Sequence, residues 1–274
     1  MKLYTCCAGG EKFPAAEING KMYRAEGFAD MNDLIRRWDE FDVDMPAGEL
    51  IEEYRICSPI EPLQDVICLG VNYQEHRAEA SDGIGFDKDE YSVYFSKRVS
   101  VPTGDGDLIP HYDFVEGLDY EAELGVIVGR TCVNVTAKEA LDYVFGYTVI
   151  NDVSARNLQK NHKQFYRGKS LDGYTPMGPC IVTADEIPDP QSLEISCTVN
   201  GEIRQKSNTS NMIAGVAEIL SELSHGITLR PGCVISTGTP AGTGMGMKPP
   251  CYLKSGDEVV CTVEKIGSLR NICE

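Results

Sequence analysis

The segment from Asp119 to Val128 constrains the fold more than any other, because acidic and apolar side chains alternate along it. Successive side chains of a β-strand point to opposite faces of the sheet. If the segment is a strand, Glu121 and Glu123 share one face, with side chains roughly 7 Å apart. The opposite face would carry four apolar residues: Ala122, Leu124, Val126 and Val128.

Two like charges this close destabilise a sheet unless something positive lies between them. A hard divalent cation such as Mg²⁺ meets this need, since it binds a few carboxylate oxygens together with waters and substrate. The spacing of Glu121 and Glu123 alone leaves a second interpretation equally open, in which both side chains cover a solvent-exposed strand face.

A third carboxylate, Asp152, follows residues 144–150, whose β-branched and aromatic side chains favour a buried strand. If a helical turn begins at Asp152, Arg156 and Gln159 lie on the same side as its carboxylate. Strand ends of this kind are common places for ligand sites. Alternatively, Asp152 only caps the helix, and the side chains above it are solvated.

His76 and Glu79 are three residues apart and would meet if their segment is helical. A carboxylate beside an imidazole raises the basicity of the ring and fixes its tautomer. The pair is therefore a candidate general base, although a lone surface histidine is the default interpretation without further context.

Four glycines, at positions 238, 242, 244 and 246, lie close together near the C-terminal end. A P-loop and a dinucleotide-binding loop both continue into a helix. Here Pro249 and Pro250 follow, and two prolines in tandem do not continue a helix. We expect the backbone around Gly238 to approach a small anion closely, with the Thr239 hydroxyl as a further donor. A plain glycine-rich turn between strands is the alternative.

The composition excludes some classes of function. The 274 residues carry a net charge of −17, which argues against nucleic-acid binding, because that binding depends on Lys and Arg at phosphates. An anionic substrate must therefore be attracted locally. No run approaches about 18 apolar residues, and the N-terminus lacks the apolar region of a signal peptide, so we expect a cytoplasmic protein with no membrane partner. The eleven cysteines are scattered and are expected to be reduced thiols.

The chain is expected to divide near residue 60, where Pro59 and Pro62 interrupt it. Residues 1–60 would form a small N-terminal α/β domain that contains an amphipathic helix over residues 30–41. Residues 61–274 would form the catalytic domain.

Three local patterns predict elements within this second domain. Thr136 and Glu139 indicate a capping box that opens a helix through Tyr143. Asn200-Gly201 indicates a tight hairpin between two strands. The apolar periodicity of residues 213–223 predicts a second helix.

Four motifs together resemble the fumarylacetoacetate hydrolase family in sequence, order and spacing. They are Asn72–Glu79, Asp119–Glu123, Gly146–Gln159 and Ser236–Gly244. The similarity extends from about Val66 to the C-terminus. The resemblance implies an α+β protein whose catalytic domain is a mixed β-roll or β-sandwich. It also implies a divalent-metal enzyme that acts on small keto acids and forms a homodimer.

The resemblance further implies roles for individual residues. Mg²⁺ or Mn²⁺ would be bound by three carboxylates, and His76, assisted by Glu79, would activate water. Lys169 would be the active-site lysine, and residues 80–91 would form a lid over the site. The complete set comprises the metal ligands Glu121, Glu123 and Asp152, the catalytic residues His76, Glu79 and Lys169, and the substrate-binding residues Arg156, Gln159, Thr239 and Gly238.

The reaction implied by this set is hydrolysis of a C–C bond in an acylpyruvate or related β-diketo acid. The activated water would attack the distal carbonyl, and the bond would break because the departing carbanion becomes a metal-bound enolate. The same chemistry supports decarboxylation of oxaloacetate-like acids or isomerisation of 2-hydroxy-dienoates. A non-catalytic keto-acid-binding protein is a remoter alternative, since every residue of the base and the metal site is present.

The chain departs from the family in two places. Cys233 stands where the family commonly has Asp, which is expected to affect a turn rather than the chemistry. The segment Tyr94–Arg98 matches only loosely, so Lys97 is a minor candidate for substrate contact.

Overall fold

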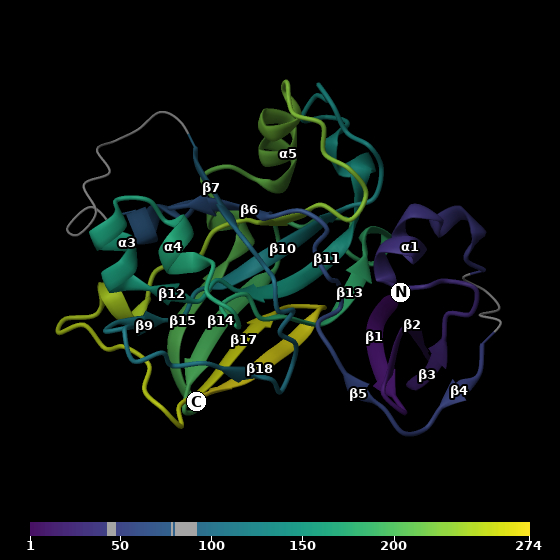
Figure 1. Ribbon diagram of the computed structural model, residues 1–274. Helices are drawn as coiled ribbons and strands as arrows, with labels where there is room; N and C mark the ends of the chain where they lie inside the picture. The colour runs from purple at the N-terminus through teal and green to yellow at the C-terminus, as the bar shows by residue number, and fades with distance from the viewer. Residues whose placement is uncertain (43–47, 78, 80–91) are drawn as a thin grey trace.

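The structure is a computed structural model that describes residues 1–42, 48–77, 79 and 92–274. Within these residues a twisted sheet of eleven strands extends through the molecule (Figure 1). Its strands are β1 (Lys2–Ala8), β2 (Glu11–Ile18), β3 (Lys21–Arg24), β4 (Leu50–Ile51), β5 (Arg55–Ile56), β6 (Val66–Gly70), β7 (Val93–Lys97), β10 (Ala122–Val128), β11 (Val144–Asn151), β13 (Met177–Thr183) and β16 (Val234–Ser236). They follow the order β4-β3-β2-β1-β13-β11-β10-β16-β6-β7, and β5 pairs with β1.

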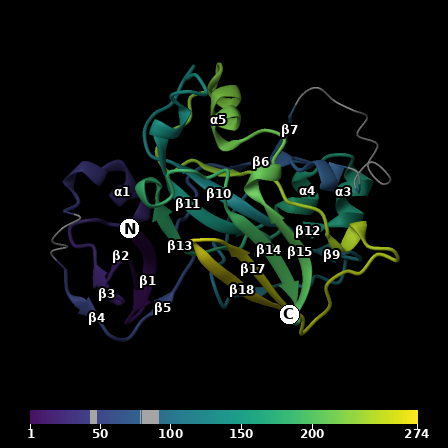
Figure 2. The ribbon, with the colours of Figure 1, turned by 180° about the vertical axis from the view of Figure 1, so that it is seen from behind.

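A second sheet packs against the middle of the first, as the view from behind also shows (Figure 2). Its five strands in the described chain are β8 (Leu108–Ile109), β14 (Glu194–Val199), β15 (Glu202–Asn208), β17 (Glu258–Val263) and β18 (Gly267–Cys273). Their order is β15-β14-β17-β18-β8, and β14, β17 and β18 contact β10 or β11. The predicted hairpin at Asn200-Gly201 joins β14 to β15 and is confirmed.

The helices are short and lie outside the sheets. The α-helices with given bounds are α1 (Met31–Arg36), α3 (Arg156–His162), α4 (Tyr166–Lys169) and α5 (Val216–Ser224), and residues 74–77 and 79 are also helical. The 3₁₀ helices are η1 (Trp38–Glu40), η2 (Ala140–Tyr143), η3 (Ala184–Glu186), η4 (Thr209–Asn211) and η5 (Gly244–Gly246). The helices thus lie outside sheets whose strands pair mainly in antiparallel fashion. The prediction of an α+β fold with a mixed β-roll or β-sandwich is confirmed.

Every residue of β10 and β11 is buried, because the second sheet covers one face and further elements cover the other. Such strands carry apolar side chains on both faces unless a site requires otherwise. The acidic face of β10 is therefore interior, and the solvent-exposed alternative for Glu121 and Glu123 is wrong.

Two predicted helices are shorter than expected. The helix expected over residues 30–41 is α1, capped by the Asp30 side chain, followed by the separate turn η1. The segment after Thr136 forms only η2. The Thr136 hydroxyl donates to Glu139 Oε2 instead of capping a backbone N–H of a helix, and the chain enters β11 directly after η2. Prediction of these two lengths was wrong.

The N-terminal strands continue the large sheet, since Lys2 and Leu3 of β1 pair with Val182 and Ile181 of β13. The division of the chain near residue 60 stays a prediction. The predicted lid, residues 80–91, lies outside the described residues.

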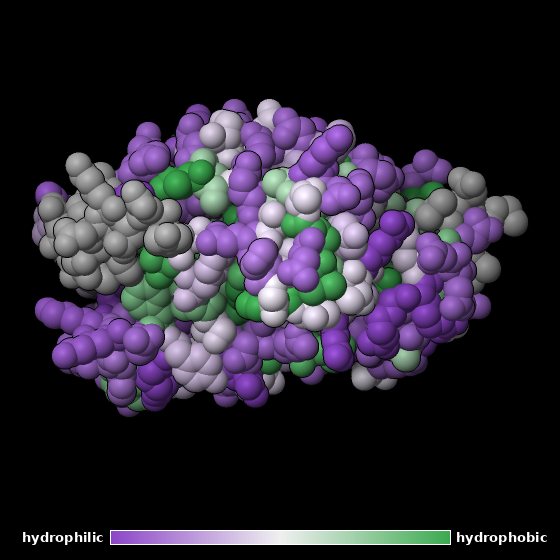
Figure 3. Space-filling view, turned by 90° about the horizontal axis from the view of Figure 1, so that it is seen from above, coloured by the Kyte–Doolittle hydropathy of each residue, from purple (hydrophilic) through white to green (hydrophobic). Residues whose placement is uncertain are grey.

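One face of the molecule, that of α5, is largely hydrophilic, with hydrophobic side chains gathered in small groups (Figure 3). Among the described residues no helix combines the length and the apolar character needed to cross a membrane.

Trp38 packs the N-terminal residues onto the large sheet. Its ring meets the edge of Phe145 in β11, with centroids 5.0 Å apart and planes at 90°. On its other side it stacks with Phe41 at 5.2 Å. Because the sequence contains one tryptophan, its fluorescence reports on the surroundings of Trp38 alone.

We predict that Phe145→Ala lowers the free energy of unfolding by about 3–5 kcal/mol, the usual cost of removing a buried phenylalanine. The emission of Trp38 in the folded state should shift to longer wavelength, because its packed edge becomes hydrated. Chemical unfolding followed by fluorescence measures both quantities. Phe28→Ala is the control, because Phe28 packs against Phe41 and this substitution leaves the Phe145 ring in place beside Trp38. An unchanged emission maximum in Phe145→Ala would contradict the packing described.

Candidate metal centre and general base

Three buried carboxylates from two neighbouring strands meet at one end of the large sheet. Glu121 directly precedes β10, Glu123 lies in it, and Asp152 follows β11. The Asp152 N–H donates to the Glu121 carbonyl at 2.8 Å, which fixes the strand ends to each other. One carboxylate oxygen from each residue lies within 4.8 Å of the others. The structure therefore brings together all three residues that the sequence suggested as metal ligands.

The local structure after Asp152 differs from the expectation of a helical turn. Ser154 and Ala155 form the short strand β12, and Ser154 pairs with Asp119 of β9 (Leu118–Asp119). Helix α3 begins only at Arg156. The helix cannot start at Asp152 because the next residues are held in this small two-stranded ladder.

Three cations neutralise most of the buried negative charge. Lys169 Nζ donates to Glu121 Oε2 and to Asp152 Oδ2, both at 2.6 Å. Arg156 Nη2 donates to the other oxygen of Glu121, also at 2.6 Å. Burial alone would raise the pKa of the Glu121 carboxyl, but Lys169 and Arg156 outweigh it and hold this pKa well below its usual value.

The third cation is Lys97, the minor candidate for substrate contact, and its hydrogen-bond partners in the structure belong to the protein itself. Lys97 is fully buried in β7, and its ammonium group donates to the Asp152 carboxylate and to the carbonyls of Val153 (3.2 Å) and Tyr174 (2.5 Å). All three of its N–H donors are thus used within the protein. Lys97 therefore fixes the position of the Asp152 carboxylate.

Glu123 is the carboxylate without a cationic partner. Its Oε2 accepts hydrogen bonds from Ser236 Oγ at 2.6 Å and from the Gly238 N–H at 2.8 Å, while Oε1 has no partner among the described residues. Burial and the neighbouring charges of Asp152 and Glu121 raise the pKa of Glu123 to about 8. Glu123 is therefore the carboxylate of this cluster whose negative charge no cation of the described structure compensates.

A divalent cation fits this cluster. Carboxylate oxygens are the ligands that Mg²⁺ and Mn²⁺ prefer. Each oxygen that accepts a hydrogen bond from a lysine or arginine keeps a second lone pair for a metal. With Asp119 included, four carboxylates face three cations, so the cluster is neutral when Glu123 is protonated. Replacing that proton by a dication would leave one net positive charge, which attracts an anionic substrate locally in a protein of net charge −17.

The glycine-rich segment supplies amides to the protein's own carboxylates. The Gly238 N–H donates to Glu123, and the Gly242 N–H donates to Glu79 Oε1 at 2.9 Å. Gly238 has a φ of 93°, a conformation that a side chain would strain. These two amides thus bind carboxylates of the chain itself, and the approach of an external anion stays a prediction. A substrate contact from Gly238 stays a prediction.

Asp119 is a further buried carboxylate that the sequence did not single out. It accepts the N–H groups of Gly244 (2.7 Å) and Met245 (3.0 Å) and the Nε–H of Arg156 (2.8 Å). It thereby ties the glycine-rich segment to the arginine that binds Glu121. Its place at the head of the Asp119–Glu123 motif was the one available signal.

His76 and Glu79 form the predicted pair. His76 is buried, and its Nδ1 lies 3.3 Å from Glu79 Oε2. Glu79 is itself fixed by the Gly242 N–H. This contact leaves Nε2 as the ring nitrogen available for proton transfer, because it has no partner in the described part of the chain.

A cavity of about 30 Å³ connects the base to the carboxylate cluster. Its lining residues include His76, Glu121, Glu123, Lys169 and Thr239. His76 and two of the candidate metal ligands, Glu121 and Glu123, therefore face one space. Lys97 and Asp152 are not among the lining residues that the structure describes.

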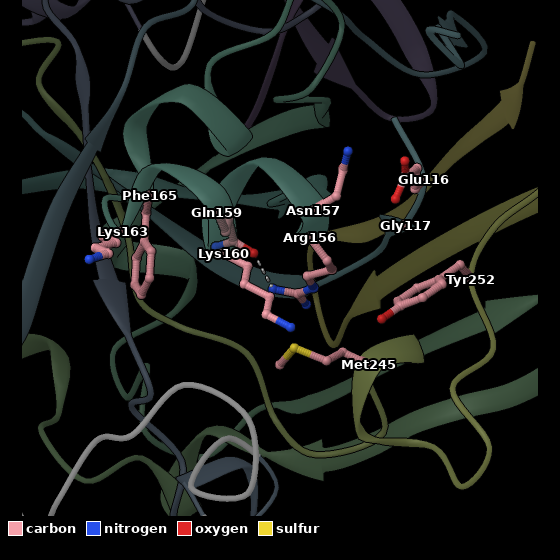
Figure 4. Close-up of a pocket in the computed structure, with 10 residues that line it drawn as sticks. All are labelled: Glu116, Gly117, Arg156, Asn157, Gln159, Lys160, Lys163, Phe165, Met245 and Tyr252. Atoms are coloured by element: carbon pink, nitrogen blue, oxygen red, sulfur yellow. Dashed lines mark hydrogen bonds between the residues drawn. The ribbon is translucent and has the colours of Figure 1, made fainter. Parts of the chain in front are cut away.

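The remaining predicted substrate contacts also reach this cavity but have protein partners. Gln159 Oε1 accepts from Arg156 Nη1 at 3.0 Å (Figure 4). Thr239 Oγ1 donates to the Ala122 carbonyl at 2.9 Å and accepts from Gln205 Nε2 at 2.8 Å. Their roles toward a substrate stay predictions.

We predict that binding of Mg²⁺ or Mn²⁺ releases close to one proton at pH 7. Glu123 is mostly protonated at this pH because its pKa is raised to about 8, whereas a metal ligand must be deprotonated. The raised pKa means that metal affinity increases with pH up to about 8 and then levels off. Calorimetric titrations in buffers of different ionisation heat count the protons.

A titration at pH 9 is the control, since the carboxylate is then already ionised and proton release should approach zero. Glu123→Gln should weaken metal binding strongly while the protein stays folded. Tight metal binding at pH 7 without proton release would show that Glu123 is not a ligand.

Comparisons with known proteins agree with this geometry. A sequence profile of the fumarylacetoacetate hydrolase C-terminal domain matches residues 65–273. The oxaloacetate tautomerase YisK of Bacillus subtilis is 43% identical over 223 residues, which are 81% of this chain and 73% of that protein. The fumarylacetoacetate hydrolase EaFAH from the psychrophilic Exiguobacterium antarcticum has a TM-score of 0.89 at 41% identity, covering 100% of this chain and 99% of that one.

A 2-hydroxyhepta-2,4-diene-1,7-dioate isomerase from Mycobacterium marinum has a TM-score of 0.79 at 30% identity and covers 100% of this chain and 98% of that one. The names of these relatives thus include a hydrolase, a tautomerase and an isomerase. The matched residues span most of the sequence, and the chain belongs to the fumarylacetoacetate hydrolase family.

Proposed function

We propose that the protein is a divalent-metal-dependent isomerase that moves a proton within a small 2-oxo acid, with the keto–enol tautomerisation of an oxaloacetate-like acid as its reaction. The observation that carries the proposal is that His76, held by Glu79, lines the same cavity as Glu121, Glu123 and Lys169. The names of two relatives, an oxaloacetate tautomerase and a hydroxy-dienoate isomerase, support it.

The reaction requires one base and no water. The keto and enol forms differ in the position of a single proton, which is on C3 in the keto form and on the C2 oxygen in the enol. His76 Nε2 would take the proton from C3 and return it to the oxygen on the neighbouring carbon. Glu79 stabilises the imidazolium formed in between, because its carboxylate lies at Nδ1.

Lys169 would stabilise the negative charge that develops on the C2 oxygen. Burial alone would lower the pKa of Lys169, but Asp152 and Glu121 outweigh it and raise this pKa, so the ammonium group keeps its proton. A fixed cation in a buried cavity stabilises such a charge more than water does. The metal, held by Glu121, Glu123 and Asp152, would polarise the 2-oxo group as a Lewis acid.

Hydrolysis of an acylpyruvate is the second candidate. The same His76 could deprotonate a water molecule instead of a substrate carbon, and EaFAH, the solved relative from Exiguobacterium, carries the name of a hydrolase. The two reactions differ in their products, since hydrolysis yields two acids and tautomerisation yields one isomer. Decarboxylation of oxaloacetate would instead release CO₂.

We predict that His76→Ala lowers the rate of oxaloacetate tautomerisation by about 10²–10⁴-fold, the usual range for loss of one general base. Metal-dependent binding of oxalate should remain nearly unchanged, because oxalate needs only the metal and its surroundings. The ultraviolet absorbance of the enol follows the rate, and product analysis separates tautomer, CO₂ and cleavage products. Full tautomerase activity in His76→Ala would remove this residue from the mechanism.

Gly246 offers a test of the support that Glu79 gives. A Cβ atom at Gly246 would lie 2.6 Å from the Glu79 carboxyl carbon, while the backbone there needs no glycine-specific φ. We predict that Gly246→Ala displaces the carboxylate and lowers kcat, with metal affinity and thermal stability close to wild type. Equal kcat in the variant and the wild type would mean that the position of Glu79 does not matter.

Assembly as a homodimer, use of a small keto acid and the absence of nucleic-acid and membrane partners stay proposals. Light scattering at micromolar concentration tests the first of them.

A further inference from the structure

Gln205 is a fully buried amide outside the residues assigned to the candidate site. It lies in β15, the edge strand of the second sheet, and is the one buried residue of that strand. A buried amide is unfavourable unless its polar atoms have partners. Here Oε1 accepts from the Ala122 N–H at 3.0 Å, and Nε2 donates to Thr239 Oγ1 and to the Pro240 carbonyl, both at 2.8 Å.

The direction of these hydrogen bonds is fixed by the backbone groups among them. The Ala122 N–H can only donate and the Pro240 carbonyl can only accept, so the side-chain amide of Gln205 has one possible orientation. The Thr239 hydroxyl therefore accepts from Nε2, and it donates its own proton to the Ala122 carbonyl at 2.9 Å. Gln205 and Thr239 thus engage both backbone groups of Ala122, the residue between two candidate metal ligands.

Residues 239–240, which Gln205 holds, lie next to the amide that supports the candidate base. The Gly242 N–H donates to Glu79 at 2.9 Å, and Glu79 lies beside His76. The segment rests directly on β15, because a Cβ atom at Gly242 would lie 2.0 Å from a backbone carbonyl oxygen of that strand. A shift of residues 239–240 away from β15 would therefore move Gly242 and loosen its hydrogen bond to Glu79.

The loosening should be partial, because the Tyr120 hydroxyl also donates to the Gly242 carbonyl, at 3.0 Å. Tyr120 directly precedes Glu121 in the chain and is itself buried. Without Gln205 this single hydrogen bond would keep Gly242 near its place but would not fix residues 239–240.

The other end of the glycine-rich segment is held independently of Gln205. Gly238, whose N–H binds a candidate metal ligand, follows Thr237. The Thr237 hydroxyl donates to the Leu124 carbonyl at 2.8 Å, and the Thr237 carbonyl accepts from Asn72 Nδ2 at 2.8 Å. Loss of Gln205 should therefore affect the side of the base and spare the side of the metal ligands.

We propose that Gln205 is a positioning residue for the general base. By fixing residues 239–240 it keeps the Gly242 amide on Glu79, and Glu79 in turn sets the place of the His76 imidazole. The inference rests on the proposed function, because it assigns the proton transfer to His76. In the described structure Gln205 has no hydrogen bond to this pair and does not line the cavity beside it, so it acts through the glycine-rich segment.

Amide hydrogen exchange of the metal-free protein, followed by NMR, tests this positioning without reference to any activity. In Gln205→Met, which keeps an unbranched side chain without the amide, the Gly242 N–H should exchange about 10-fold faster than in the wild type. Loss of one buried hydrogen bond changes an equilibrium by about this factor. The Gly238 N–H should keep its exchange rate.

Gln191→Met is the matched control. Gln191 also accepts from a backbone N–H, that of Val216 at 2.7 Å, and donates to a backbone carbonyl, that of Thr209 at 2.9 Å. These partners lie outside the glycine-rich segment, so the substitution should leave exchange at Gly238 and Gly242 unchanged.

A double-mutant cycle with the base separates positioning from a purely structural role. Gln205→Met should lower kcat for tautomerisation by about 10-fold, because small displacements of a reacting group are costly, while KM and metal-dependent oxalate binding stay close to wild type. In the His76→Ala background the same substitution should lower kcat by at most about 2-fold, since the group that it positions is absent.

Gln205→Glu serves as a second variant if Gln205→Met does not fold. It keeps an acceptor for the Ala122 N–H, but its ionised carboxylate has no proton for Thr239 or Pro240, so the same pattern is expected.

An unchanged exchange rate at Gly242 would overturn the inference, and so would an equal loss of kcat with and without His76. Faster exchange at Gly242 alone, in a protein whose wild type shows no tautomerase activity, would sink the proposed reaction and leave the positioning role standing.

Discussion

The concentration of four carboxylates in one buried region is the constraint on which the rest of the structure depends. Isolated buried charges are very unfavourable, so each must be paired, hydrogen-bonded or protonated. Lys97, Arg156 and Lys169 supply three positive charges, and backbone amides of the glycine-rich segment supply hydrogen bonds. Glu123 has hydrogen bonds but no cationic partner, and its pKa is raised because no positive charge compensates its carboxylate. The place where the fold leaves charge unbalanced is the place where a dication would bind.

The architecture follows from the need to bring these groups together from distant parts of the sequence. Strands β10 and β11 lie side by side and hold the carboxylates at their adjoining ends. Helix α4 places Lys169 beside these carboxylates, and strand β7 places Lys97 beside Asp152. The glycine-rich segment can approach both Asp119 and Glu79 because side chains at Gly244 and Gly246 would collide with their carboxylates. One turn thus supports the candidate metal centre and the general base together.

Much of the site could be predicted from local patterns, since Glu121 and Glu123 share a strand face by period-two alternation and His76 meets Glu79 by helical spacing. The hairpin at Asn200-Gly201 is equally local. The roles of Lys97 and Asp119 could not be predicted, because they depend on contacts between residues 37 to 125 positions apart in the sequence. The start of α3 was misplaced for a similar reason: the pairing of β12 with β9 is tertiary and overrides the helical spacing.

Crystallographic location of Mn²⁺ by its anomalous scattering tests the central claim most directly. Crystals soaked with Mn²⁺ should show one strong anomalous peak between Glu121, Glu123 and Asp152, with the unpartnered oxygen of Glu123 bound to the ion. The peak should disappear in Glu123→Gln crystals of the same form. A wild-type structure in which Mn²⁺ binds elsewhere, with this cluster unchanged, would contradict a metal centre at these carboxylates.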